Sequence, residues 1–250
     1  MRRESGAAGK RCGRLILNIL ALDTSGEWCS VALWLDGQLL SRGEHAGQRH
    51  SELLLPMIDA LLRESGLALT DLDGIAFGAG PGSFTGLRIA CGVTQGLAFG
   101  AGLPVVPVGT LEALAEASAA PRVVAALDAR MEEVYHAAYV REDAGWREVH
   151  APSLCAPAAA PPVEGADWTG CGDGFAVQGS ALRVRYAGQL RDVRDDLRPH
   201  ARDMVRLAAS RFAQAGGLDP AQAAPLYVRD KVALSVAERA ARQALAPERP

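Results

Sequence analysis

Short apolar runs separated by turn residues dominate the first part of the chain. An apolar run at 15–23 predicts a strand buried on both faces, and a second strand is predicted at 28–35. Asp36-Gly37 indicates a tight hairpin turn, because a type I′ turn needs positive φ. A third strand follows at 38–44. The pattern therefore predicts a three-stranded meander at the start of the fold rather than a β-α-β unit.

The segment 51–64 is predicted to be a helix that is apolar around almost its whole circumference. A surface helix normally carries one apolar stripe. The apolar residues here suffice for two buried faces; they are Leu53, Leu54, Leu55, Met57, Ile58, Ala60, Leu61 and Leu62. One face would cover the helix's own sheet. The other is explained by burial inside the same chain or by a partner, and the pattern favours a partner because few other helices are predicted.

A glycine-rich loop at 78–86 follows a predicted strand at 75–77 and leads into a predicted helix at 84–100. This order sets backbone N–H groups at a helix N-terminus, where anions are favoured. The helix also carries Gly92, Gly96 and Gly100 at four-residue spacing. Each glycine inside a helix costs about 1 kcal/mol relative to alanine. We therefore interpret the loop chiefly as the turn that sets this helix for close packing against another backbone.

The meander of the first part recurs later in the chain. After Pro121, strands are predicted at 123–128, 133–140 and 146–149. A buried strand that ends in Asp, an alternating strand and a turn thus occur at 15–44 and again at 122–150, which indicates an internal duplication. A Pro- and Ala-rich surface loop is predicted at 151–165, and a helix at 198–215.

These patterns predict four parts along the chain. The parts are a disordered tail at 1–14, a first lobe at 15–120 that carries a partner surface, a second lobe at 121–232, and a helix or tail at 233–250. The apolar run that follows the basic tail contains Asn18 and continues into Asp23 without a small-x-small cleavage site. We therefore expect a strand there and not a signal peptide.

Composition narrows the class of protein. A hydrophobic content of 49% and a charged content of 22% are those of a globular chain, and a net charge of −3 predicts no broad basic face for nucleic acid. The five cysteines are widely spaced and form no C-x-x-C pair. This favours a reducing compartment, the cytoplasm, over a disulfide or zinc framework. We also expect no contact with a membrane, because no apolar run is long enough to span one.

Several catalytic motifs are missing from the sequence. A P-loop is excluded because Gly9-Lys10 is followed by Arg11. Ser83 is flanked at −2 and +2 by Pro81 and Thr85, so it does not stand in a nucleophile elbow. The five histidines contain no H-E-x-x-H motif and no pair at helical spacing, so no helical metal site is predicted.

A candidate phosphate site stands at the end of the first strand. A carboxylate and hydroxyls at a strand end are able to hold a magnesium–phosphate group, although the same residue types also close turns. The residues of this candidate site are Asp23, Thr24, Ser25, Gly80, Gly82 and Ser83. Asp128 ends the equivalent strand, but Ala129-Arg130 follows where a phosphate clamp needs Gly or a hydroxyl residue. The set is therefore a candidate vestigial phosphate site, and turn chemistry is the interpretation that the residues favour.

Five segments of the sequence resemble the TsaB (YeaZ) family. The most specific is Gly80-Pro81-Gly82-Ser83-Phe84-Thr85-Gly86-Leu87-Arg88. The others are LDTS at 22–25, HSE at 50–52 with LPMI at 55–58, DARMEEVY at 128–135 and PLYVR at 225–229. The resemblance covers about 15–233 and leaves both tails outside.

The resemblance implies an actin-like ATPase (ASKHA) fold, α/β, with two duplicated lobes that each hold a mixed sheet flanked by helices. It also implies a non-catalytic dimerisation subunit of the complex that transfers a threonylcarbamoyl group to the adenosine next to the tRNA anticodon. The implied partners are a catalytic TsaD-type paralogue and a TsaE-type P-loop ATPase, with a homodimer in isolation and tRNA reached only through the complex. No catalytic residue, metal or cofactor is expected in this chain, and ATP, ADP or magnesium only at the level of the complex.

The resemblance further implies that the partner is bound through the two helices of the first lobe. The predicted interface residues are His50, Ser51, Leu54, Ile58, Leu61, Phe84, Arg88, Gly92 and Gly96. Two other functions stay open. The first is a small-molecule kinase or ATPase of the same fold that would use Asp23 to hold the metal nucleotide. The second, a glycoprotease-like peptidase, is less favoured because this sequence contains neither a pair of metal ligands nor an activated nucleophile.

Overall fold

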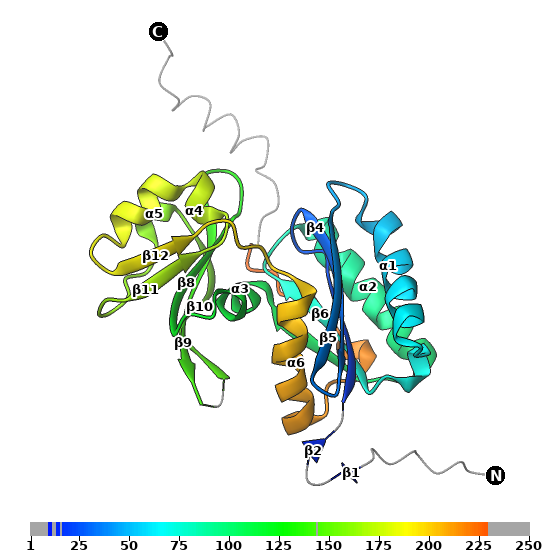
Figure 1. Ribbon diagram of the computed structural model, residues 1–250. Helices are drawn as coiled ribbons and strands as arrows, with labels where there is room; N and C mark the ends of the chain where they lie inside the picture. The colour runs from blue at the N-terminus through cyan, green and yellow to red at the C-terminus, as the bar shows by residue number, and fades with distance from the viewer. Residues whose placement is uncertain (1–9, 12–13, 16, 144, 230–250) are drawn as a thin grey trace, which may run out of the picture.

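The computed structural model describes residues 10–11, 14–15, 17–143 and 145–229, which form two lobes, each built on a five-stranded sheet (Figure 1). The first sheet has the order β5-β4-β3-β6-β7. Its strands are β3 (Asn18–Asp23), β4 (Trp28–Leu35), β5 (Gln38–His45), β6 (Gly74–Gly80) and β7 (Val105–Gly109). β3, β4 and β5 form the predicted antiparallel meander, while β6 and β7 run parallel to β3.

The second sheet repeats the first. Its order is β10-β9-β8-β11-β12, again with a meander of three antiparallel strands followed by two parallel strands. Its strands are β8 (Arg122–Asp128), β9 (Val134–Glu142), β10 (Gly145–Cys155), β11 (Trp168–Cys171) and β12 (Leu190–Arg194). The predicted duplication and the α/β actin-like fold with two lobes are therefore confirmed.

Helices cover both faces of the first sheet (Figure 1). On one face, α1 (His50–Ser65) and α2 (Phe84–Ala101) pack against alternate residues of β3, Leu20 and Leu22. On the other face, α6 (Ala201–Ala215) packs its Met204 and Val205 against Ile19 and Ala21. The continuous apolar run of β3 thus reflects burial on both faces, as predicted.

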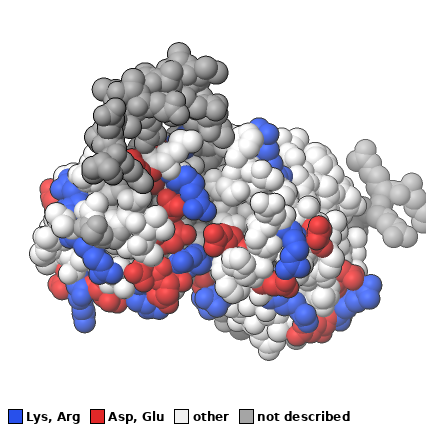
Figure 2. Space-filling view, turned by 90° about the horizontal axis from the view of Figure 1, so that it is seen from above, with Lys and Arg blue, Asp and Glu red and all other residues white. Residues whose placement is uncertain are grey.

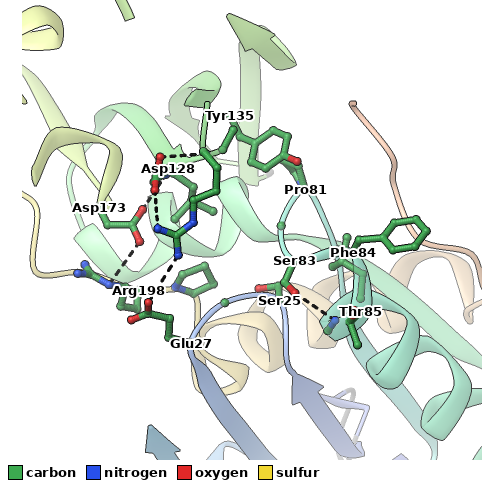
Figure 3. Close-up of a pocket in the computed structure, with 18 of the residues that line it drawn as sticks. Ser25, Glu27, Pro81, Ser83, Phe84, Thr85, Asp128, Tyr135, Asp173 and Arg198 are labelled. Carbon is green, nitrogen blue, oxygen red and sulfur yellow. Dashed lines mark hydrogen bonds and ion pairs between the residues drawn. The ribbon is translucent and has the colours of Figure 1, made fainter. Parts of the chain in front are cut away.

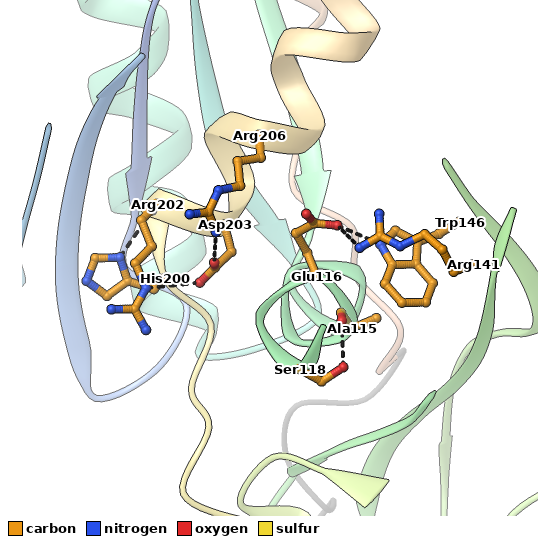
Figure 4. Close-up of polar contacts among 9 residues, drawn as sticks. All are labelled: Ala115, Glu116, Ser118, Arg141, Trp146, His200, Arg202, Asp203 and Arg206. Carbon is orange, nitrogen blue, oxygen red and sulfur yellow. Dashed lines mark hydrogen bonds and ion pairs between the residues drawn. The ribbon is translucent and has the colours of Figure 1, made fainter. Parts of the chain in front are cut away.

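The last helix of each half packs on the sheet of the other half. α3 (Thr110–Ser118) lies on the second sheet, where Glu116 accepts hydrogen bonds from Arg141 (2.7 Å) and Trp146 (2.9 Å) of the second meander (Figure 4). α6 comes from the second half but covers the first sheet. The lobe boundaries of 15–120 and 121–232 stay a prediction for the order along the chain; in space, α3 lies against the second sheet and α6 against the first.

Short helices complete the second lobe. α4 (Gly174–Val177) and α5 (Gly179–Arg185) cover the face of the second sheet opposite α3. The described residues also form three short 3₁₀ turns, η1 (Leu69–Asp71), η2 (Pro157–Ala159) and η3 (Pro220–Gln222). Among the described residues, no helix is both long and apolar enough to cross a membrane.

Two predicted segments differ from the structure, and one lies outside it. The predicted surface loop at 151–165 begins as strand, because β10 continues to Cys155 opposite β9. Within the predicted disordered tail, Lys10–Arg11 pairs with Arg14–Leu15 as the short strands β1 and β2. The predicted helix or tail at 233–250 lies outside the described residues.

Candidate functional site

The glycine loop packs tightly against the end of β3. It runs from the last residue of β6 through a cis Gly80–Pro81 peptide to the start of α2. A Cβ atom added at Gly78, Gly82 or Gly86 would overlap an atom of the facing segment 23–25. The overlapped atoms are, in that order, Asp23 Oδ1, the Ser25 carbonyl oxygen and the Thr24 carbonyl oxygen. Glycine is therefore needed at positions 78, 82 and 86, because any larger residue would prevent this close approach.

Hydrogen bonds hold the loop in this place. Ser83 N donates to the Ser25 carbonyl oxygen at 2.7 Å, and Thr24 Oγ1 donates to the Gly86 carbonyl oxygen at 2.7 Å. The Ser83 hydroxyl caps α2 by accepting from Gly86 N at 3.3 Å. These bonds join the start of α2 to the end of β3, which supports the interpretation of the loop as the turn that positions α2.

The residues of the candidate phosphate site contact one another, but they do not all face the space between the lobes. Asp23 is buried between β6 and α6, beside Gly78 and Met204, and accepts from Ser25 Oγ (3.1 Å) and Ser25 N (3.2 Å). Burial raises the pKa of Asp23 to about 6. Only part of the predicted set lines the space between the lobes: Ser25, Gly82 and Ser83 do, whereas Asp23, Thr24 and Gly80 do not. The hydrogen bonds from Ser25 to Asp23 are those of a turn closed by its own side chain, which favours the turn alternative.

A cleft of about 1010 Å³ lies between the two lobes, and its charged residues are shown in Figure 3. Asp173 and Asp128 lie side by side in the second lobe, where Asp173 Oδ1 accepts from Asp128 N at 2.9 Å. Arg198 is 3.7 Å from the other oxygen of Asp173, and Arg130 is 3.2 Å from Asp128 Oδ2. Burial raises the pKa of Asp173 above the ordinary value.

The arginines of the cleft are already paired with carboxylates. Arg130 pairs with Asp128 and, at 3.8 Å, with Glu27 of the first lobe, while Arg229 pairs with Glu133 at 2.9 Å. A phosphate group in the cleft would have to compete with these pairs. Within the described part of the chain, no group of three or more His, Cys, Asp or Glu side chains is arranged to hold a metal ion.

Exposed apolar side chains also line the cleft. Six large hydrophobic side chains that are at least 37% exposed line it; they are Trp28, Phe84, Met131, Val177, Leu226 and Tyr227. Seen from above, Lys and Arg are interspersed with Asp and Glu on the described surface (Figure 2). The lining of the cleft therefore combines exposed apolar side chains with paired charges.

The predicted partner surface on α1 and α2 needs a correction on α1. His50, Leu54, Ile58 and Leu61 are buried in the chain's own core, so these side chains are not available to a partner. His50 Nε2 also contacts the Gly26 carbonyl oxygen at 3.0 Å. Among the predicted residues of this helix, only Ser51 is exposed. The outward side of α1 instead carries Leu55, which is 50% exposed and was not among the predicted interface residues.

The predicted surface on α2 faces outward. Gly92 and Gly96 are exposed, and so is Gly100; no atom lies within 4 Å of a Cβ added at any of the three. Phe84 is 37% exposed, and Arg88 is exposed with its guanidinium 3.8 Å from the Phe84 ring. Phe99, which was not among the predicted interface residues, is 61% exposed on the same helix. The four-residue spacing that aligned the glycines does not include Phe99.

The C-terminal segment reaches this surface and was not predicted to do so. Tyr227 Oη accepts a hydrogen bond of 3.0 Å from Arg88 Nε, and its ring lies 5.5 Å from the Phe84 ring. Two residues later, Arg229 contacts the second lobe. PLYVR at 225–229 was one of the motifs of the resemblance, but a motif alone does not indicate what it contacts.

Comparisons with known proteins identify the family. The family model TsaD, described as tRNA N6-adenosine threonylcarbamoyltransferase, matches residues 43–235. The tRNA threonylcarbamoyladenosine biosynthesis protein TsaB of Haemophilus influenzae is 41% identical over 229 residues, which are 86% of this chain and 95% of that protein. The chain belongs to the TsaB family. The TsaB protein of Escherichia coli is 39% identical over 226 residues, covering 87% of this chain and 96% of that protein.

Solved structures of TsaB (YeaZ) proteins have the same fold. YeaZ from Pseudomonas aeruginosa is 41% identical with a TM-score of 0.76, over 85% of this chain and 100% of that one. A second Pseudomonas aeruginosa structure, of an uncharacterized protein with similarity to peptidase YEAZ, is 42% identical with a TM-score of 0.79, over 86% of this chain and 100% of that one. The resemblance of the sequence motifs to the TsaB family is thus confirmed.

Proposed function

We propose that this chain is a non-catalytic subunit in tRNA threonylcarbamoyladenosine biosynthesis that binds a catalytic TsaD-type paralogue through the outward faces of α1 and α2. Membership of the TsaB family supports the pathway. In the proposed assembly a TsaE-type P-loop ATPase joins the pair, and tRNA is reached only through the complex. ATP, ADP or magnesium would act at the level of the complex, and the assembly would work in the cytoplasm.

The observation that carries the partner surface is the row of exposed glycines on α2. Open space around Gly92, Gly96 and Gly100 means that packing inside the chain does not require glycine at these positions. Together they cost about 3 kcal/mol of helix stability relative to alanine. Close approach of a second backbone would explain that cost. Leu55 and Phe99, exposed on the same two helices, supply apolar area for such a contact.

The same surface would also serve a second copy of this chain when the paralogue is absent. Two copies related by twofold symmetry would present identical glycine rows and apolar residues to each other. We therefore propose a homodimer in isolation that exchanges for the complex with the paralogue.

The kinase or ATPase function is the second candidate. The cleft between duplicated lobes, with Asp128 and Asp173 adjacent in it, favours this function. Asp23, however, is buried and does not line the cleft, and the cleft arginines are engaged by carboxylates. Calorimetry with magnesium-ATP separates the two proposals, because micromolar binding by the isolated chain would favour the kinase. For the weaker peptidase alternative, Ser83 is a poor nucleophile because its hydroxyl caps α2.

Binding to the paralogue tests the proposal directly. A Gly96→Leu variant should fold at least as stably as the parent, because leucine is a better helix former than glycine. It should nevertheless lose binding to a TsaD-type protein in calorimetry, because the side chain would hold the two backbones apart. Val184→Glu is the control, since Val184 is 76% exposed on the second lobe. Parent-like binding by Gly96→Leu would overturn the proposed surface.

A further inference from the structure

The segment that follows α6 runs along the first lobe before it crosses to the second. Leu218 pairs with Val105 at the edge of the first sheet, and the carbonyl oxygens of Pro220 and Ala223 accept hydrogen bonds from Gln95 of α2 at 3.3 and 3.2 Å. Leu226 N then donates to the Ala79 carbonyl oxygen at 2.6 Å. Up to Leu226 the segment is therefore part of the first lobe, although it follows the second lobe in the sequence.

Arg229 carries the segment across to the second lobe. Its Nη2 donates to the Ala129 carbonyl oxygen at 2.9 Å and lies 2.9 Å from Glu133 Oε2, while Nη1 is 3.6 Å from Met131 Sδ. The Arg229 side chain is only 15% exposed. One guanidinium thus contacts the start, the middle and the end of the turn that joins β8 to β9.

That turn has an unusual backbone. Arg130, Met131 and Glu132 have φ values of 62°, 56° and 63°, so three successive residues other than glycine are left-handed. Such a conformation is unfavourable for residues with a Cβ and persists only where surrounding contacts hold it. Arg229 supplies contacts of that kind at both ends of the turn.

The other ion pair between this turn and the first lobe is weaker. Arg130 and Glu27 are 3.8 Å apart, and their side chains are 76% and 64% exposed. Solvent screening leaves such a pair little influence on the structure. Arg229 is therefore the stronger of these two links between the turn and the first lobe.

On the first lobe, the segment contacts the start of α2. Tyr227 accepts the hydrogen bond from Arg88 and packs on Phe84, two residues before Arg229. Phe84 and Arg88 belong to the proposed partner surface. A molecule that covers these two residues would change the contacts of Tyr227. Because Tyr227 is only two residues from Arg229, such a change would also affect the contacts of Arg229 with the turn.

We propose that residues 226–229 form a strap that couples the partner surface at the start of α2 to the β8–β9 turn of the second lobe. Tyr227 is the positioning residue on the α2 side and Arg229 the positioning residue on the turn side. Because coupling between two sites is reciprocal, a partner on α2 tightens the turn, and loss of the Arg229 contacts loosens the start of α2. The part of this inference that concerns the partner rests on the proposed function.

Hydrogen exchange of backbone amides, measured by mass spectrometry on the full chain, tests the strap without a partner. The Arg229→Gln and Tyr227→Phe variants should each raise exchange about threefold both in 129–134 and in 84–88. Tyr227→Phe keeps the ring on Phe84 and so guards against a variant that fails to fold. Arg42→Gln, which breaks an exposed pair with Glu64 inside the first lobe, is the control and should change neither segment. If Arg229→Gln raised exchange only in 129–134 and Tyr227→Phe raised it only in 84–88, the strap would be overturned.

A second arm adds the TsaD-type protein. Binding to the parent should slow exchange in 129–134 about threefold, and this protection should be lost in Arg229→Gln although binding persists. Binding to the parent without protection of the turn would overturn the strap and leave the proposed function standing. If no binding occurs, the proposed function fails, and the first arm alone decides whether the strap exists.

Discussion

Arg211 of α6 donates hydrogen bonds from Nη2 to both carboxylate oxygens of Glu112 of α3, at 2.7 and 2.5 Å. Its Nη1 donates to the Pro107 carbonyl oxygen at 2.9 Å. Because α6 covers the first sheet and α3 the second, this ion pair joins the two exchanged helices where the lobes meet.

Breaking this pair should destabilise the whole chain. Glu112 is only 16% exposed, so Arg211→Met would leave a largely buried carboxylate without its partner and cost about 1–3 kcal/mol. The free energy of unfolding in urea measures this. Arg42→Gln, whose pair with Glu64 is 48% exposed on both sides, should cost less than about 0.5 kcal/mol. Equal losses for the two variants would contradict the role of Arg211.

The glycines that face the segment 23–25 and those on the outer side of α2 should respond in opposite directions to alanine. At Gly86 the new Cβ would overlap the Thr24 carbonyl oxygen, a backbone atom that cannot easily move, so Gly86→Ala should cost about 2–4 kcal/mol. At Gly96 the space is open, so Gly96→Ala should add about 0.5–1 kcal/mol. Thermal unfolding of both variants tests this, and a loss of stability at Gly96 would show that this glycine is needed inside the fold.

Asp23 should make stability depend on pH in a defined direction. Burial raises its pKa from 3.8 to about 6, so between these values the folded chain keeps a proton that the unfolded chain releases. Protonated Asp23 therefore contributes its full share to the free energy of unfolding below about pH 4. This contribution is lost as the pH rises through about 6, the pKa of Asp23 in the folded chain.

The Asp23→Asn variant has no such titration, so its free energy of unfolding relative to the parent should rise by roughly 2–3 kcal/mol between pH 4 and pH 7. Urea unfolding at several pH values measures it. Asp59→Asn, at the exposed pair with Arg63, serves as the control. A difference between Asp23→Asn and the parent that does not change with pH would contradict the assignment.

The sequence predicted the strands of the first sheet well because local signals were strong. The apolar run of β3 and the Asp36-Gly37 turn each allow one local structure, and the structure has both. The exchange of α3 and α6 was missed because it depends on which sheet a helix meets, and an apolar stripe is the same for either sheet.

The residues predicted for a partner surface on α1 are buried in the chain's own core, and their spacing already indicated this. Leu54, Ile58 and Leu61 stand at i, i+4 and i+7, the spacing of a single stripe, and that stripe is the one that faces the core. Leu55 is next to this stripe and is exposed. The most apolar line on a helix is best assigned first to its own sheet and only the remainder to a partner.

The role of Arg229 could not be predicted from the sequence. Its contact with Ala129 joins residues a hundred positions apart, and the left-handed turn that it holds contains no glycine to indicate positive φ. The burial of Asp23 away from the cleft lining could not be predicted for a related reason. The order of residues set Asp23 at the end of β3, but the direction of its side chain depends on the packing of α6 against Gly78.

Reconstitution of tRNA threonylcarbamoyladenosine formation from purified TsaD-type and TsaE-type proteins tests the central claim most directly. Product should form when this chain is added and should be lost when it is omitted. The Gly96→Leu variant should fail to restore it, while Val184→Glu, far from the α2 surface, should restore it fully. Equal product formation with the parent chain and with Gly96→Leu, or without any added chain, would contradict the account.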